Sequence, residues 1–80
     1  MPKITVQYFA VLREQRGLSE EVLETTASTP RDLYRSLKDE YKFSLETSSL
    51  RVAVNDEFST FDHKLTDGDT IVFIAPVAGG

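Results

Sequence analysis

The first hydrophobic pattern of the chain is an alternation near its start. In residues 3–10, Ile4, Val6 and Tyr8 are separated by polar residues, as in a strand that buries one face. Phe9 breaks this alternation because it shares the polar face. The strand is therefore expected either to bend at Phe9 or to leave an aromatic ring outside.

Helical spacing follows this strand. Residues 11–17 fit one or two helical turns, and residues 20–25 fit a second short strand. The main helix is predicted to begin at Thr29 or Pro30 and to end at about Tyr41, because threonine caps a helix and proline suits its first position. Its buried face consists of apolar residues four positions apart, widened by one tyrosine: Leu33, Leu37, Tyr41 and Tyr34.

The second half of the chain alternates short strands with turns. The predicted elements are a loop over 42–49, a strand over 50–54, a turn at 55–56, a short strand over 57–61, a turn at 66–69 and a strand over 70–75 that Pro76 ends. In the last strand Ile71 and Phe73 share one face, while Val72 and Ile74 share the other.

This order of elements, β-β-α-β-(β)-β, predicts an α+β fold. One main helix on one face of a mixed sheet is the simplest two-layer core for 80 residues. The arrangement is typical of a β-grasp, ubiquitin-like roll. We expect one such domain over residues 1–76, followed by a flexible, extended C-terminal tail over residues 77–80.

Composition excludes several classes of function. The absence of cysteine excludes a disulfide scaffold, a thiolate zinc site, an iron–sulfur cluster and a cysteine nucleophile. A net charge of −4 argues against nucleic-acid binding. No stretch approaches the ~20 apolar residues of a membrane span, and residues 1–10 lack a signal-peptide pattern. We therefore predict a cytoplasmic protein without nucleic-acid or membrane partners.

Few polar residues suggest a catalytic or metal-binding role. His63 is the only histidine and is expected in a surface loop, and no metal site is predicted. Asp67 and Asp69 flank a glycine, as in an ordinary turn, and are too few for a calcium loop. The acidic residues Glu20, Glu21 and Glu24 are expected to form a solvated face. An autonomous enzyme is therefore not indicated.

The last four residues, Val77-Ala78-Gly79-Gly80, carry the clearest functional signal. Two residues without Cβ form a thread thin enough for a narrow channel in a partner. The carboxylate of Gly80 has no side chain in front of it, so it can be activated as an acyl-adenylate and passed to a nucleophile. A terminal Gly-Gly directly behind the last strand of a β-grasp domain is a strong indication of this use.

The chain resembles the family of small, sulfur-carrier subunits of molybdopterin synthase. The resemblance covers nearly the whole length and is sharpest in YFAVLRE (residues 8–14), VNDEFSTFDHKLTDGDTIVFI (54–74) and the terminal PVAGG. It implies that a ubiquitin-activating-like adenylyltransferase uses ATP and Mg²⁺ to adenylate Gly80. A sulfur donor, supplied by a cysteine desulfurase, would then convert the adenylate to a thiocarboxylate.

The resemblance also implies the partner that consumes the sulfur. The tail would enter the large subunit of molybdopterin synthase, in a heterotetramer, and give its sulfur to cyclic pyranopterin monophosphate. The active site would belong to the large subunit, so this chain would be a non-catalytic, sulfur-donating subunit without a permanently bound cofactor. Family positions matching Phe9, Phe58 and Ile74 are apolar interface residues, and we expect these three to form an exposed patch beside the tail.

Other readings of the same tail stay open. The chain could be a sulfur carrier for thiazole synthesis or tRNA thiolation, although the retained FDHKLTDGD and PVAGG favour molybdopterin. It could also be a ubiquitin-like modifier that forms isopeptide bonds through Gly80, or an interaction module with an inert tail.

Overall fold

The structure, a computed structural model, describes residues 2–74. The predicted tail residues Val77, Ala78, Gly79 and Gly80 lie outside the described residues. The elements are β1 (Lys3–Tyr8), α1 (Ala10–Arg16), β2 (Glu20–Glu24), α2 (Pro30–Tyr41), the 3₁₀ helix η1 (Thr47–Ser49), β3 (Arg51–Val54), β4 (Glu57–Ser59) and β5 (Thr70–Ile74).

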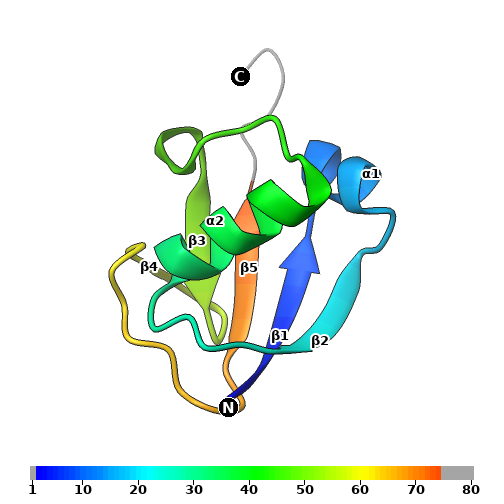
Figure 1. Cartoon of the computed structure of the whole chain (residues 1–80). Helices are drawn as coiled ribbons and strands as arrows, with labels where there is room; N and C mark the ends of the chain where they lie inside the picture. Colours follow the sequence, from blue (N-terminus) through cyan, green and yellow to red (C-terminus); the bar gives the residue numbers. More distant parts are fainter. Residues whose placement is uncertain (1, 75–80) are drawn as a thin grey trace.

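The five strands form one mixed sheet in the order β2-β1-β5-β3-β4. β1 and β5 are parallel neighbours at the centre, and the other pairs are antiparallel. Figure 1 shows α2 crossing one face of this sheet, with α1 beside the end of β1. The predicted ubiquitin-like β-grasp fold is thereby confirmed for the described residues, with α1 as the short additional helix.

The core lies between α2 and the central strands. Inward-facing residues of β1 and β5, such as Val6, Ile71 and Phe73, have no exposed surface. The Tyr34 ring packs edge-on against Phe73, with 5.1 Å between ring centroids. The alternation of apolar and polar residues in β1 therefore assigned the buried side of that strand correctly, whereas β5 is apolar on both faces and carries no such signal.

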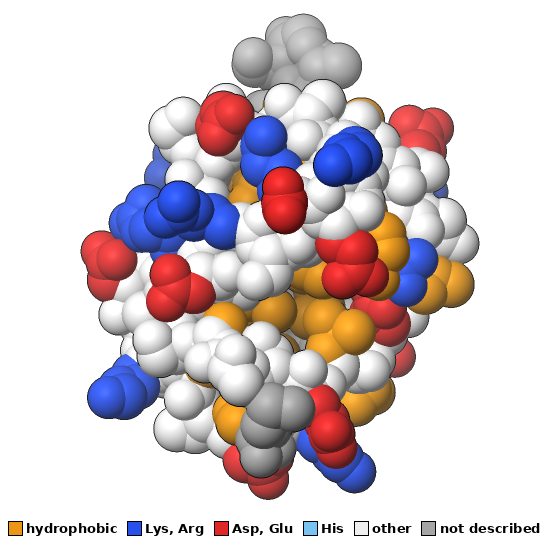
Figure 2. All heavy atoms as spheres, viewed as in Figure 1, with side chains coloured by type: hydrophobic (Ala, Val, Ile, Leu, Met, Phe, Trp, Pro, Cys, Tyr) orange, Lys and Arg blue, Asp and Glu red, His pale blue; other side chains and the backbone are white. Residues whose placement is uncertain are grey.

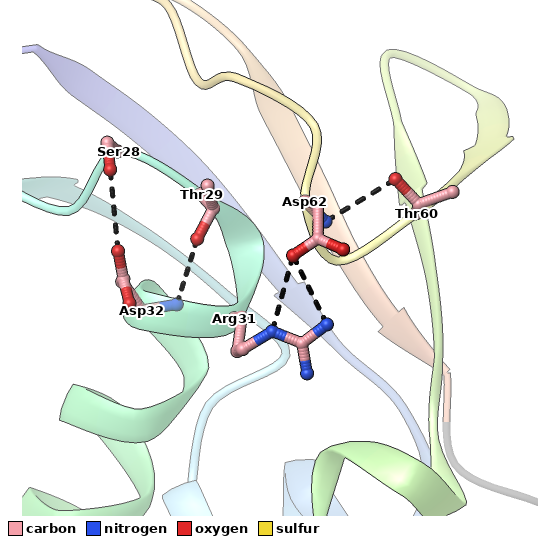
Figure 3. Close-up of polar contacts among 6 residues, drawn as sticks. All are labelled: Ser28, Thr29, Arg31, Asp32, Thr60 and Asp62. Atoms are coloured by element: carbon pink, nitrogen blue, oxygen red, sulfur yellow. Dashed lines mark hydrogen bonds and ion pairs between the residues drawn. The ribbon is translucent and has the colours of Figure 1, made fainter.

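The start of α2 follows the predicted cap. The Thr29 hydroxyl accepts a hydrogen bond from the Asp32 backbone N–H at 3.3 Å, and Ser28 contacts the carboxylate of the same aspartate (Figure 3). Pro30 occupies the first helical position, where a missing N–H costs nothing. At the other end, Lys42 takes a left-handed conformation with φ of 59°, which ends the helix.

Two local predictions need correction. Residues 42–49 contain the 3₁₀ turn η1, because the Ser49 amide donates to the Glu46 carbonyl at 2.9 Å; the polar run concealed this turn. β4 ends at Ser59 instead of residue 61, because Phe61 leaves the sheet edge and stacks on the Phe73 ring at 6.3 Å. Residue 75, predicted to end the last strand, lies outside the described residues.

Candidate functional site

The sheet face turned away from α2 carries exposed apolar side chains near the end of β5. Phe58 on β4 is paired with Ala53 on β3, and Ala53 is also paired with Val72 on β5. Residues paired across strands share a face, so these three form one row. Ala53 and Val72 are 9% and 8% exposed, whereas Phe58 is 78% exposed. The predicted exposure of Phe58 is confirmed.

Ile74 and Phe9 extend this row toward the end of β5. Ile74 is two residues beyond Val72, so it faces the same way, and it is half-buried. Because Tyr8 is paired with Phe73 and Phe9 is extended, Phe9 continues the register beside Ile74. Phe9 is 48% exposed.

Phe9 lies on the open sheet face because its backbone is extended and successive strand residues point to opposite faces, so its ring points away from the buried Tyr8. The chain turns directly after it, since Ala10 has a positive φ of 53°, which takes the backbone out of the β1 direction into α1. The broken alternation predicted either a bend or an exposed ring, and the structure has both.

We call Phe9, Phe58, Ile74, Ala53 and Val72 the apolar patch. Neighbouring strands lie about 4.8 Å apart, so Phe58 and Ile74, which are two strands apart, are separated by roughly 10 Å or more, and Ala53 and Val72 fill the space between them. The row of apolar residues is therefore continuous, and Phe9, Phe58 and Ile74 supply nearly all of its exposed surface. The two filling residues were missed in the sequence, although the alternation of β3 and β5 already placed them on this face.

Polar groups border the apolar patch on both sides. A shallow hollow beside Phe58 is lined by Arg51 and Ser59, and Arg51 is paired with Ile74 across the strands. A second hollow beside Phe9 is lined by residues of β1, α1 and the start of β2, including Arg13. An apolar centre with a polar rim is typical of a protein-docking surface.

The apolar patch lies where β5 leads into the tail. Ile74 is both the last residue of β5 and a member of the patch. Gly80 is six positions beyond Ile74 in the sequence, and six steps along the chain span at most about 20 Å. A partner that docks on the patch is therefore within reach of Gly80.

The other sequence candidates have structural roles or none. His63 is exposed in the loop after β4. Asp67 accepts a hydrogen bond from the Lys3 backbone N–H at 2.7 Å, which ties the turn to the start of β1. Among residues 2–74, no three His, Cys, Asp or Glu side chains cluster closely enough to hold a metal ion. In the same residues, no helix is long and apolar enough to cross a membrane.

Asp69 is a buried carboxylate that organises the turn before β5. It accepts hydrogen bonds from the Thr66 backbone N–H at 2.8 Å, the Thr66 hydroxyl at 3.0 Å and the Asn55 amide at 3.0 Å. Burial alone would raise the pKa of Asp69, but these hydrogen bonds outweigh it and lower the pKa. The turn chemistry predicted for this segment is confirmed, with Asp69 as its buried centre.

The prediction of a solvated acidic face is wrong for Glu21. Its carboxylate is only 12% exposed and accepts two hydrogen bonds from the Arg16 guanidinium, both at 2.8 Å, and one from the Tyr8 hydroxyl at 2.6 Å. The Arg16 bonds hold the pKa of Glu21 below its usual value. Arg16 also lies over the Tyr41 ring at 3.9 Å. Glu21 therefore joins α1, β1, β2 and α2, while Glu20 and Glu24 are exposed as expected.

Sequence comparison assigns the chain to a family. Residues 6–80 match the model described as the ThiS family. The chain belongs to the ThiS family. The molybdopterin synthase sulfur carrier subunit of Escherichia coli (strain K12) is 38% identical over 82 aligned positions, which cover 96% of this chain and 99% of that protein. The resemblance to this group of proteins is thus confirmed.

Solved structures agree with the fold of this ThiS-family chain. A putative molybdopterin converting factor subunit 1 from Pyrococcus furiosus is 29% identical, with a TM-score of 0.77 over 96% of this chain and 100% of that one. Small archaeal modifier protein 1 from Methanosarcina acetivorans is 26% identical, with a TM-score of 0.78 over 100% and 98% of the two chains. A chain in a complex of molybdopterin-converting factor subunits 1 and 2 from Helicobacter pylori 26695 shares the fold at 23% identity, with a TM-score of 0.67 and coverage of 98% and 99%.

Proposed function

We propose that this chain is the sulfur carrier subunit of a molybdopterin synthase. The observation that carries the proposal is the exposed apolar patch on the strand that leads to Gly79-Gly80, in a chain 38% identical to such a subunit over nearly its full length. The patch suits reversible docking, and the glycine tail suits delivery of its end into a partner.

The chemistry takes place at the carboxylate of Gly80. A carboxylate oxygen attacks the α-phosphorus of Mg²⁺-bound ATP in an adenylyltransferase, and pyrophosphate leaves. The sulfur of a donor persulfide then attacks the acyl carbon and AMP leaves; cleavage of the remaining S–S bond by a thiol releases the thiocarboxylate. In the large subunit, this anionic sulfur is the nucleophile that attacks cyclic pyranopterin monophosphate.

Each partner needs the same two features of this chain. The adenylyltransferase and the large subunit must both hold the domain and admit the tail, and the apolar patch lies within reach of Gly80 for both purposes. The chain itself contributes docking and the reactive end, while catalytic groups come from the partner. This division agrees with the described residues, whose buried polar groups serve the fold.

The decisive experiment alters only the end of the chain in a reconstituted pterin-sulfuration system. Removal of Gly80, or one alanine added after it, is expected to abolish sulfuration. One alanine added before the N-terminus is the matched control and should leave activity unchanged. Sulfuration that survives either C-terminal change would refute the carrier role.

The rival reading as a protein modifier has one specific observation in its favour, the 26% identity to a small archaeal modifier protein. A modifier forms an isopeptide bond between the Gly80 carbonyl and a lysine amine of another protein. Mass spectrometry of tryptic peptides from cells that make the chain tests this reading. Because Lys64 is the last trypsin site in the sequence, a modifier leaves residues 65–80 attached to target lysines, and a dedicated carrier leaves none.

A further inference from the structure

A row of basic side chains lies on the opposite side of the molecule from the apolar patch. Arg31, Arg35, Lys38 and Lys42 are spaced four, three and four residues apart, so they follow one flank of α2 and its C-terminal cap. Figure 2 shows Lys and Arg side chains above this helix, with Asp and Glu side chains among them. We call these four residues the basic stripe. At about 1.5 Å per residue, it is about 16 Å long.

The chain's own carboxylates already occupy half of the basic stripe. Asp62, from the loop after β4, lies 3.2 Å from the Arg31 guanidinium (Figure 3), and Glu46, from the loop before η1, lies 3.4 Å from the Lys38 ammonium. The two acidic side chains are 76% and 72% exposed. Pairs this exposed contribute little to stability, so an incoming carboxylate can replace them at little cost.

The other half of the basic stripe is open. Among residues 2–74, Arg35 and Lys42 are exposed and have no carboxylate within ion-pair distance. Both line a hollow between α2 and the following loop, and the buried Phe43 ring lies at this hollow. Asp39 and Glu46 also line it, so both signs of charge are present there. The hollow thus offers two cations that have no carboxylate partner among residues 2–74.

We propose that the basic stripe is a docking site for an extended acidic segment of a second protein. An extended segment of five residues is about 16 Å long, which matches the stripe. Because the stripe is on the helix side of the sheet and the apolar patch is on the other side, the two surfaces can be occupied at the same time. The second protein can therefore hold the domain while the first holds the patch.

Charge distribution favours a protein segment over a larger polyanion. The chain has nine Lys and Arg against thirteen Asp and Glu, and four of the nine form the basic stripe. Three of the thirteen acidic residues, Asp39, Glu46 and Asp62, lie at the stripe, so the rest of the molecule carries five basic against ten acidic side chains. A nucleic acid or an anionic membrane extends beyond the stripe and meets this negative field, whereas a short acidic segment touches only the stripe.

The test uses NMR chemical-shift titration of the full chain with a short, end-blocked oligoglutamate peptide at low salt. Saturable shifts are expected in α2 and residues 43–46, and the variant R35E/K42E should bind about tenfold more weakly. The variant K3E/K64E has the same change in net charge at two exposed cations outside the stripe, and it should bind like the parent chain.

Three results would overturn the proposal. The first is the absence of saturable shifts in α2 with the parent chain. The second is equal weakening in both double variants, which would show a response to net charge alone. The third is binding of a single-stranded DNA oligonucleotide of equal charge to the same residues as tightly as the peptide, which would assign the stripe to a different class of partner.

Discussion

Replacement of Phe58 by alanine is expected to weaken docking to a partner while leaving the stability of the fold nearly unchanged. The Phe58 side chain is 78% exposed on the edge strand β4, so most of its surface is still available to a partner. Complete burial of a phenylalanine side chain is worth about 1.5–3 kcal/mol. A partner that buries the surface still exposed on Phe58 therefore gains roughly 1–2 kcal/mol. We expect the Phe58→Ala variant to lose this contribution, so that its Kd for the large subunit rises roughly 5- to 30-fold.

Two measurements on the same preparations test this prediction. Isothermal titration calorimetry with the purified large synthase subunit gives the Kd, and thermal denaturation gives the stability. The free energy of unfolding should change by no more than about 0.5 kcal/mol, because the side chain has few packing partners to lose. The Phe73→Ala variant is the contrasting control, since Phe73 is fully buried and its truncation costs about 3–5 kcal/mol.

A matched exposed residue controls for non-specific loss of apolar surface. Val22 is 65% exposed on β2, the opposite edge strand of the sheet from β4. The Val22→Ala variant should retain the parent Kd. The reasoning is refuted if Phe58→Ala binds as tightly as the parent chain, or if its melting temperature falls as far as that of Phe73→Ala.

Three further predictions concern the patch and the carboxylates of Glu21 and Asp69. Phe9→Glu should weaken large-subunit binding by at least about tenfold with little loss of thermal stability; a large drop in melting temperature would instead assign Phe9 to the core. Glu21→Gln should cost about 1–3 kcal/mol in urea denaturation, because Arg16 and Tyr8 lose a charged acceptor, and a change near zero would contradict that role. Since the pKa of Asp69 is lower in the folded chain than in the unfolded one, its stabilising effect is present above the unfolded pKa and is lost as pH falls toward the folded one. Asp69→Asn should therefore flatten the fall in stability below about pH 4, and an unchanged acid limb of the pH–stability curve would contradict this.

The regular elements could be read from the sequence because each has a strong local signal. The alternation in β1 reflects a sheet with one face buried under α2, the continuous apolar run of β5 reflects its central place in the sheet, and Thr29-Pro30 marks the start of α2. The exposure of Phe9 followed from its conflict with the alternation, since a residue that breaks a strand pattern must leave the core or distort it.

Features that depend on distant residues were less predictable. Glu21 looks like its acidic neighbours in sequence, but its surroundings are set by Arg16 and Tyr8, which α1 and β1 bring to it. The shortening of β4 likewise depends on Phe61 reaching the Phe73 ring, a contact made only after the sheet has formed. Local propensity does not encode such contacts, because tertiary packing decides them.

The candidate site likewise has one part with a local sequence signal and one part set by distant residues. The exposure of Phe9 and Phe58 could be predicted, because each is an apolar residue without a place in a buried face. The continuity of the apolar patch depends on cross-strand register, which places Ala53 between Phe58 and Val72 and cannot be read from one strand at a time.

The proposed function requires that sulfur be carried on the carboxylate of Gly80. Intact-mass measurement of the chain, co-expressed with an adenylyltransferase and a cysteine desulfurase, tests this requirement. We expect the mass increase of one oxygen-to-sulfur exchange, located by fragmentation at Gly80 and absent when the adenylyltransferase is omitted. An unchanged mass despite active partners, or a sulfur located at any other residue, would contradict it.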